Sequence, residues 1–538
     1  MVGADTIVKC LEKEGVEVLF GYPGVAICPF FNSILNTNIE AILVRTEQNA
    51  AHAASGYARV SGKVGVCVAT SGPGATNLIT GIATAYADSI PLVCITGQVE
   101  SSLLGYDTFQ EADITGACES FVKYSYLVKD VKDIPRIMKE AFYIASTGRK
   151  GPVLIDIPSD IQRAQISKFD YPEEVKMRTY KPTVKGHAVQ IKRVMSELSK
   201  AKKPIICAGG GVILSDARKE LQTFAHKYNI PVVSTLMGIG AMPTEDSLYF
   251  GMVGNNGKSY ANRAMNESDL LIMIGARVAD RAVSQPDLIT ENKVLVHIDV
   301  DPAEIGKQVG PHIPLVGDIK HIFNDFEKEN FDNDFSEWLD ILNDYKANSP
   351  KRKAPSNDFV DPAEFIKKLS DKMNDDAIYV ADVGQNQMWS CGYYNAKNGR
   401  FLTSGGMGTM GYSIPAAMGA KRANKDLQVV AVCGDGSFQM SMMELATMRQ
   451  YNIPTKIFVF HNGYLGLVRE HQHSAYKGNY SVVDLSGSPE FEYIAKAYGM
   501  DFIKLSNMEK IDQKIDDILS NNKPYLIEVM IDPMDTVK

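Results

Sequence analysis

The sequence has 538 residues, of which 45% are hydrophobic and 22% charged. This balance is typical of a globular protein with large cores, and the length predicts two to four domains, with three as the natural division. The net charge of −8, without any basic block, argues against a nucleic-acid partner. Eight scattered cysteines without a CxxC pair indicate reduced core residues of a cytoplasmic protein. No apolar stretch approaches the length of a membrane span and no signal segment is evident, so we expect neither membrane anchoring nor secretion.

The first segment, residues 1–167, alternates short apolar strands with helices. Each strand ends in a polar or glycine-rich turn, as is typical of a parallel sheet covered on both faces. Such folds bind ligands at the carboxyl ends of their strands. After a helix at 4–14, the expected strands lie at 16–20, 41–44, 64–69 and 91–95.

Glu47 stands where the second strand gives way to a helix. Its position alone favours a surface carboxylate that complements the helix dipole.

The middle segment, residues 186–346, follows a polar linker and alternates again. Gly209-Gly210-Gly211 ends its first strand and Asp299 its last, which suggests a dinucleotide site. The glycines do not match GxGxxG, so dinucleotide binding and an ordinary α/β domain both stay open. The expected strands are 204–208, 232–234, 270–274 and 294–298, and charged helices over 325–346 close the segment.

The third segment, residues 359–538, repeats the layout of the first, with a strand at 378–381 and a glycine-rich stretch at 404–411. An apolar run over 429–432 ends in Gly-Asp-Gly-Ser, a helix is expected over 442–449, and a strand over 457–460 ends in Asn-Gly-Tyr. Two parallel strands would therefore deliver Asp435 and Asn462 to one sheet edge. A carboxylate and an amide oxygen suit Mg²⁺ shared with phosphates, although a GDG turn with a solvated aspartate is the plain alternative.

Eight stretches in this order resemble the thiamin diphosphate-dependent enzymes, and within them the catalytic subunits of acetohydroxyacid (acetolactate) synthases. The likeness covers nearly the whole chain. The stretches are GYPG (21–24), TEQNAAHAASGYAR (46–59), TSGPGATNLITGIATAYADSIPLVCITGQV (70–99), FQEADI (109–114), GRKGPVLIDIP (148–158), HIDVDPAEIGK (297–307), MGTMGYSIPAAMGAK (407–421) and GDGSFQMSMMELAT (434–447), the last together with HNGYLGLVRE (461–470).

The resemblance implies three doubly wound parallel-sheet domains: pyrimidine-binding (1–167), central and Rossmann-like with FAD (186–346), and pyrophosphate- and magnesium-binding (359–538). It implies a transferase of branched-chain amino acid biosynthesis that decarboxylates pyruvate and passes the two-carbon unit to a second 2-keto acid, pyruvate or 2-oxobutanoate. The implied cofactors are thiamin diphosphate, Mg²⁺ and a structural FAD. The implied assembly is a homodimer that can pair into a dimer of dimers, with a regulatory small subunit as a partner.

The resemblance also assigns roles to single residues and replaces the surface role of Glu47. Glu47 would hydrogen-bond the aminopyrimidine and help to activate the cofactor, Met410 would hold the cofactor bent, and Arg281 would grip the acceptor carboxylate. Phe109 and Gln110 would line the substrate pocket. The metal ligands would be Asp435, Asn462 and the Tyr464 carbonyl. The thiamin diphosphate contacts would be Pro23, Gly24, Pro73, Asn77, Val383, Gly384, Gln385, Asn386, Gly408, Met410, Gly434, Asp435, Gly436, Ser437, Leu465 and Gly466. The FAD contacts would be Arg149, Gly209, Gly210, Gly211, Thr235, Leu236, Met237, Gly275, Arg277, Asp299, Val300, Gly317 and Asp318.

The chain departs from this family pattern near the substrate. His471 replaces a tryptophan that favours 2-oxobutanoate, which leaves the acceptor preference open. The other departures are Val25, Thr46, Ser159, Val278, Ala279 and Asn386. Three alternatives therefore remain: a carboligase with pyruvate as donor and another acceptor such as a keto-sugar, a pyruvate oxidase or decarboxylase, and a non-catalytic dinucleotide-binding protein.

Overall fold

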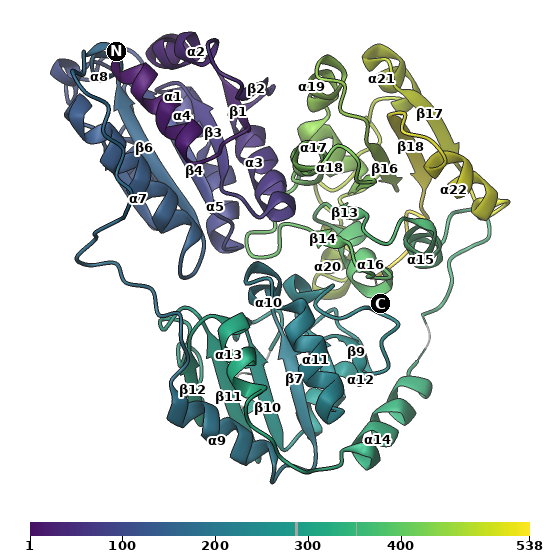
Figure 1. Ribbon diagram of the computed structural model, residues 1–538. Coiled ribbons are helices and arrows are strands. Elements are labelled where there is room, and N and C mark those ends of the chain that lie inside the picture. Colours follow the sequence, from purple (N-terminus) through teal and green to yellow (C-terminus); the bar gives the residue numbers. More distant parts are fainter. Residues whose placement is uncertain (284, 286–288, 351, 538) are drawn as a thin grey trace.

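A computed structural model describes residues 1–283, 285, 289–350 and 352–537. Three six-stranded sheets, each flanked by helices, occupy the corners of a triangle in Figure 1. Every strand pairs in parallel with its neighbours. The three doubly wound α/β units expected from the sequence are confirmed.

The first sheet has the strand order β2-β1-β3-β4-β6-β5. Its order reverses between β1 and β3, and the strand ends at such a reversal leave a crevice for ligands. The elements are α1 Gly3–Lys13, β1 Val18–Tyr22, α2 Cys28–Ile34, β2 Glu40–Leu43, α3 Glu47–Ser61, β3 Gly65–Ala69, α4 Pro73–Asn77, α5 Ile79–Ala87, β4 Leu92–Gln98, α6 Ile114–Cys118, β5 Tyr124–Leu127, α7 Ile134–Ser146, β6 Pro152–Pro158 and α8 Ser159–Arg163.

The second sheet has the order β12-β11-β10-β7-β8-β9, which is the arrangement of classic dinucleotide-binding folds. Its reversal lies between β7 and β10. The elements are α9 Ala188–Leu198, β7 Pro204–Ala208, α10 Gly210–Leu214, α11 Arg218–Tyr228, β8 Val232–Ser234, β9 Tyr249–Met252, α12 Ser259–Glu267, β10 Leu270–Ile274, β11 Val294–Asp299, β12 Ile313–Val316, α13 Ile319–Phe326 and α14 Ser336–Ala347.

The third sheet has the order β14-β13-β15-β16-β18-β17, the same pattern as the first, with its reversal between β13 and β15. The elements are α15 Pro362–Lys372, β13 Ile378–Ala381, α16 Gln385–Tyr393, β14 Arg400–Leu402, α17 Ser413–Ala423, β15 Val429–Gly434, α18 Asp435–Ser441, α19 Glu444–Gln450, β16 Lys456–His461, α20 Gly466–Ala475, α21 Phe491–Tyr498, β17 Asp501–Leu505, α22 Ile511–Leu519 and β18 Tyr525–Met530.

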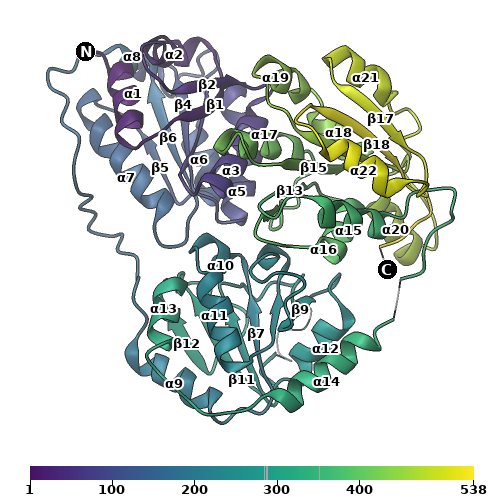
Figure 2. The ribbon, with the colours of Figure 1, turned by 45° about the vertical axis from the view of Figure 1, so that its right-hand side comes forward.

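Helices α3 and α17 join the first and third units, and both views show them between the two sheets (Figures 1 and 2). They cross very closely, because a Cβ built on Gly56 would lie 2.0 Å from Ala416 O and one built on Gly419 would lie 1.8 Å from Ala53 O. Only glycine fits at these two positions. The contact merges the cores of the two units into one cluster of buried residues and fixes α3, which begins with Glu47.

Three local expectations need correction. The GDG sequence is the start of a helix rather than a turn, since α18 begins at Asp435, where the Gly434 N–H donates to Ser437 Oγ at 3.1 Å. The charged helices expected over 325–346 are confirmed only in part, as the end of α13 and most of α14, because residues 327–335 between them are not helical. Cys28 is exposed, whereas the other seven cysteines are buried as expected.

Candidate functional site

A cavity of about 140 Å³ lies at the reversal point of the third sheet, and we call it the third-sheet pocket. All of its walls come from the third unit, mainly from the ends of β13, β15 and β16 and the helices that follow them. The expected residues that line it are Val383, Gly384, Gln385, Asn386, Met410, Gly434, Asp435, Gly436, Ser437, Asn462, Tyr464, Leu465 and Gly466. Gly408 precedes Met410 and has a φ of +66°.

Asp435 and Asn462 lie side by side because Gly434 of β15 pairs in register with Phe460 of β16. The Asp435 carboxylate accepts hydrogen bonds from the Gly436 N–H at 2.9 Å and the Gly463 N–H at 2.7 Å. Burial raises the pKa of this carboxyl above its ordinary value, while the Gly463 N–H and the nearby His461 act against the rise. A cation bound at the carboxylate would offset the same burial cost.

The Asn462 amide is held in a fixed orientation. Its Nδ2 donates to Gln385 Oε1 at 2.8 Å, and its Oδ1 accepts the Tyr464 N–H at 3.0 Å while keeping a free lone-pair direction. The Asp435 and Asn462 oxygens and the Tyr464 carbonyl form the hard-oxygen donor set that Mg²⁺ prefers. The Gln385 side chain is itself occupied, because its Nε2 donates to Asp535 O at 2.9 Å and to Glu470 Oε1.

The pocket also fits a diphosphate. Helix α16 begins after Gly384, whose φ of +132° is a backbone conformation that favours glycine. A Cβ at Gly436 would lie 2.9 Å from Leu465 Cδ2, and one at Gly466 would lie 1.8 Å from Gln385 Oε1. Glycine at these two positions therefore lets the walls of the pocket pack closely, and α16 begins at the pocket, where the first backbone N–H groups of a helix can bind an anion.

Asp382 is a buried carboxylate that the sequence analysis did not single out. It accepts the Val383 and Gly411 N–H groups through Oδ1, at 2.8 and 2.9 Å, and the Ser413 N–H through Oδ2 at 2.8 Å. Burial raises its pKa. By tying the end of β13 to residues 411–413, it fixes the neighbouring Met410 against the pocket. The sequence signal that could have identified Asp382 is an acidic residue directly after an apolar strand.

Glu47 lies in a separate half-site at the first sheet, and only 9% of its surface is exposed. The Asn77 amide donates to its Oε2 at 3.0 Å. A Cβ built on Gly74 would lie 3.3 Å from Glu47 Oε1 and 2.7 Å from Thr70 Cγ2, so the glycine lets α4 approach the carboxylate. Among the described residues, the buried Thr70 hydroxyl has no hydrogen-bond partner, which marks a polar site beside Glu47 that a ligand can satisfy.

Other expected residues surround this half-site. A Cβ at Gly24 would lie 2.5 Å from Thr70 Cβ, which places the turn after Pro23 against Thr70. Pro73 opens α4, and Gln110, with a φ of +60°, packs on Gly72 just before it. Phe109 is 87% exposed. The structure therefore groups Glu47, Asn77 and Gln110 in one half-site and the Asp435 set in another.

Glu444 is a second residue that the sequence analysis missed. It is fully buried on α19 of the third unit, yet its Oε1 accepts the Arg45 N–H at 2.8 Å and the Asn49 amide at 3.0 Å, both from the first unit. Thr447 Oγ1 donates to its other oxygen at 2.7 Å. Glu444 thus holds the start of α3, where Glu47 stands. Since the link joins residues about 400 positions apart, no local pattern reveals it.

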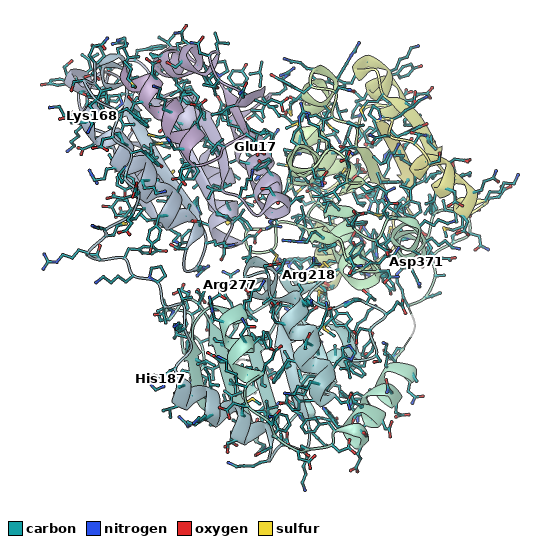
Figure 3. The ribbon with its side chains drawn as sticks, viewed as in Figure 1. Glu17, Lys168, His187, Arg218, Arg277 and Asp371 are labelled. Carbon is teal, nitrogen blue, oxygen red and sulfur yellow. The ribbon has the colours of Figure 1, made fainter. Side chains whose placement is uncertain are left out.

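A larger cavity, of about 240 Å³, lies where the three units meet, and we call it the three-domain pocket. It opens at the reversal point of the second sheet, and Figure 3 shows Arg277 at the edge of that unit facing the other two. The expected residues that line it are Arg149, Gly210, Gly211, Thr235, Leu236, Met237, Gly275, Arg277, Asp299, Val300 and Asp318. Gly209 packs behind this wall, since its Cβ would lie 2.1 Å from Gly275 O, and Gly317 precedes Asp318 in the loop after β12.

The chemistry of this wall fits a dinucleotide. Arg149 donates to Glu304 Oε1 at 2.7 Å and to Ser89 Oγ at 3.0 Å, so it lies between the first and second units. Burial raises the pKa of Asp299, whose Oδ1 accepts the Asp301 N–H at 2.9 Å. Asp299 stands at the end of β11, where an acidic residue can accept ribose hydroxyls. The wall combines arginines, glycines and one buried acid at the point where the strand order reverses. Dinucleotide-binding folds use such groups at this point.

Arg281 lines the three-domain pocket and is absent from the walls of the third-sheet pocket. The structure also shows where four of the residues that depart from the family pattern lie. Thr46 is the N-cap of α3, Ser159 is the buried first residue of α8, Val25 is 86% exposed, and His471 is exposed on α20 with its ring 5.8 Å from that of Tyr476.

Among the described residues, no cluster of three or more His, Cys, Asp or Glu side chains could hold a metal by itself. None of the helices in this part of the chain has the length and apolar character needed to cross a membrane.

The chain is similar to known proteins over nearly its whole length. Three family models match: the N-terminal TPP-binding domain of thiamine pyrophosphate enzymes over residues 1–117, their central domain over 191–326, and their C-terminal TPP-binding domain over 382–529. A protein of Methanococcus aeolicus named "Probable acetolactate synthase large subunit" is 43% identical over 99% of this chain and 92% of its own length. Proteins named "Acetolactate synthase large subunit" from Lactococcus lactis and Haemophilus influenzae are 43% and 42% identical, over 98% and 99% of this chain and 92% and 95% of their own lengths.

Proposed function

We propose an activity for this chain that follows from its family. The chain belongs to the acetolactate synthase large subunits, which are thiamine pyrophosphate enzymes. The protein joins two molecules of pyruvate, takes up one proton and releases one CO₂, and the product is 2-acetolactate. The observation that carries the proposal is the third-sheet pocket, where Asp435 and Asn462 converge from adjacent strand ends.

Thiamin diphosphate and Mg²⁺ would be held by the two half-sites together. Asp435, Asn462 and the Tyr464 carbonyl would hold Mg²⁺, and the N–H groups around Gly384 and Gly436 would hold the diphosphate. Thiamin diphosphate supplies the electron sink that makes decarboxylation of a 2-keto acid feasible.

Glu47 acts at the other end of the cofactor. Its buried carboxylate would hold the aminopyrimidine ring of the cofactor, and Asn77 keeps this carboxylate oriented through Oε2. The bound ring would supply an internal base next to the reacting carbon, and the charge of Glu47 would support that general-base assistance. Met410, fixed by Asp382 through Gly411, gives the pocket an apolar wall that excludes water.

The active unit is a homodimer, since the third-sheet pocket takes its walls from the third unit alone and Glu47 lies in the other half-site. Large apolar side chains beside both half-sites support this assembly. Val25 and Phe109 next to the Glu47 half-site are 86% and 87% exposed, and Val482 near the third-sheet pocket is 94% exposed. Exposed apolar groups of this size mark surfaces that a partner covers. The large-subunit names of the relatives support a small regulatory partner, and we place the protein in the cytoplasm.

FAD occupies the three-domain pocket in this proposal and has a structural role. The strand order of the second sheet and the Arg149, Arg277 and Asp299 wall support it. In this proposal Arg281, on the same wall, grips the carboxylate of the acceptor.

The test is incubation of the purified protein with pyruvate, thiamin diphosphate, Mg²⁺ and FAD. We expect acetolactate in a ratio of one to each CO₂, and no product when Mg²⁺ is chelated. Release of CO₂ without acetolactate would show a decarboxylase and overturn the proposal. Turnover that requires an added electron acceptor would show an oxidase.

A further inference from the structure

One segment of the chain, residues 403–411, reaches both large pockets. It follows β14 and leads into α17. Gly405 lines the three-domain pocket, and Met410 lines the third-sheet pocket. We call it the shared segment, because it contributes a wall residue to each pocket.

A buried ion pair of the first unit holds the shared segment at the three-domain pocket. Asp88 accepts the Gly406 N–H through Oδ1 at 2.7 Å and the Gly405 N–H through Oδ2 at 3.2 Å. Arg59 donates to Asp88 Oδ2 at 2.8 Å and to Thr403 O at 2.7 Å. The two side chains are only 4% and 0% exposed, yet both line the pocket.

Close packing makes this end of the segment rigid. A Cβ at Gly405 would lie 2.2 Å from Met237 Sδ, and one at Gly406 would lie 2.9 Å from Ala87 Cβ. Farther along, Thr409 Oγ1 and Thr84 Oγ1 are hydrogen-bonded at 2.7 Å, and Asp382 holds Gly411. Close packing and hydrogen bonds therefore hold the segment both at Gly405 and at Gly411.

We propose that Arg59 and Asp88 are positioning residues that couple the two cofactor sites. A ligand in the three-domain pocket packs against Arg59, Asp88 and Gly405 and locks the shared segment, which places Met410 for thiamin diphosphate. FAD then raises the affinity for thiamin diphosphate, and by thermodynamic linkage thiamin diphosphate raises the affinity for FAD by the same factor. The inference rests on the proposed function only for the identity of the two ligands.

A plain structural role for the pair would stabilise the interface without linking the sites. The chain offers a matched control for that role in the ion pair between Glu40 of β2 and Arg422 of α17, which also joins the first and third units. The Glu40 pair lies outside the shared segment and outside the walls of the three-domain pocket.

The experiment is calorimetric titration of the full-length protein with thiamin diphosphate and Mg²⁺, with and without saturating FAD, and the reverse titration with FAD. For the wild type we expect both dissociation constants to fall by one common factor of about 10, within the usual range of coupling between sites. In Asp88→Asn we expect the factor to fall to about one, because the amide nitrogen repels the N–H donors around it. Glu40→Gln keeps the wild-type factor.

Each outcome decides the inference. Equal affinities with and without FAD in the wild type would overturn it, whether or not any variant folds, and would leave the proposed activity untouched. Loss of coupling in Glu40→Gln as well as in Asp88→Asn would show that the Arg59–Asp88 pair only stabilises the interface, and it would overturn the inference. Failure to bind FAD while acetolactate still forms would also overturn the inference. Failure to bind thiamin diphosphate at all would overturn the proposed function itself.

Discussion

Replacement of Glu444 by alanine tests how the third unit positions Glu47. Glu444 is the acceptor for the Arg45 N–H, the Asn49 amide and the Thr447 hydroxyl, and two of these belong to the start of α3. Burial raises the pKa of this carboxyl, and the hydrogen bonds from Thr447, Asn49 and Arg45 act against the rise. In Glu444→Ala, three buried donors lose their acceptor and the first turn of α3 loses its anchor.

The magnitude follows from the number of orphaned donors. A buried polar group without a partner costs about 1–3 kcal/mol. The vacated space admits water that satisfies part of the loss, so we expect about 3 kcal/mol for the three donors together. For units of this size that corresponds to a fall in melting temperature of about 6–12 °C. Glu444→Gln keeps an acceptor oxygen for Arg45 and Asn49, and we expect less than half of that fall.

The assay combines thermal unfolding with thiamin diphosphate titration and turnover. Glu444→Ala should lower kcat more than Glu444→Gln even at temperatures where both are folded, because Glu47 is then held less firmly. Equal melting temperatures and turnover in both variants and the wild type would refute the reasoning that Glu444 anchors α3. A large loss in Glu444→Gln alone would show that the charge, rather than the acceptor geometry, is what matters.

Four further outcomes are expected. Glu47→Gln should lower kcat by about 10²–10⁴ with an unchanged melting temperature, as loss of general-base assistance requires, and unaltered kcat would remove Glu47 from the chemistry. Asp435→Asn should raise the Mg²⁺ concentration for half-maximal activity at least about 10-fold, measured by titration after chelation. Burial raises the pKa of Asp156 to about 7, although hydrogen bonds from Thr96 and Gln98 act to lower it. The folded state therefore keeps a proton on Asp156 that the unfolded state releases near pH 4. Because of this group, the free energy of unfolding falls between about pH 4 and 7. Asp156→Asn should reduce this pH dependence of the melting temperature. His471→Trp should raise the share of 2-aceto-2-hydroxybutanoate when pyruvate and 2-oxobutanoate compete, and an unchanged product ratio would exclude His471 from acceptor choice.

Strands with many buried apolar residues could be predicted closely from the sequence. The strands at 204–208, 232–234, 270–274 and 378–381 have the expected bounds, because their neighbours on both sides impose continuous apolar runs. The strands β5, β9, β12, β14 and β17 were not anticipated, and all five lie at sheet edges. An edge strand has one neighbour and tolerates mixed polarity, so its pattern is weaker. Two interior strands, β6 and β18, had no expected bounds despite their largely apolar sequences.

The sequence by itself determined the α/β class, the strand ends that carry Asp435 and Asn462, and through resemblance the family. Those features depend on local runs of residues, which the chain displays directly. The structure alone decided the strand orders, and with them the crevices at β13/β15 and β7/β10. It alone brought Glu444 to Arg45 and the Arg59–Asp88 pair to Gly405. These contacts join residues hundreds of positions apart, and the stabilisation of a buried carboxylate by distant N–H groups leaves no periodic trace in the sequence.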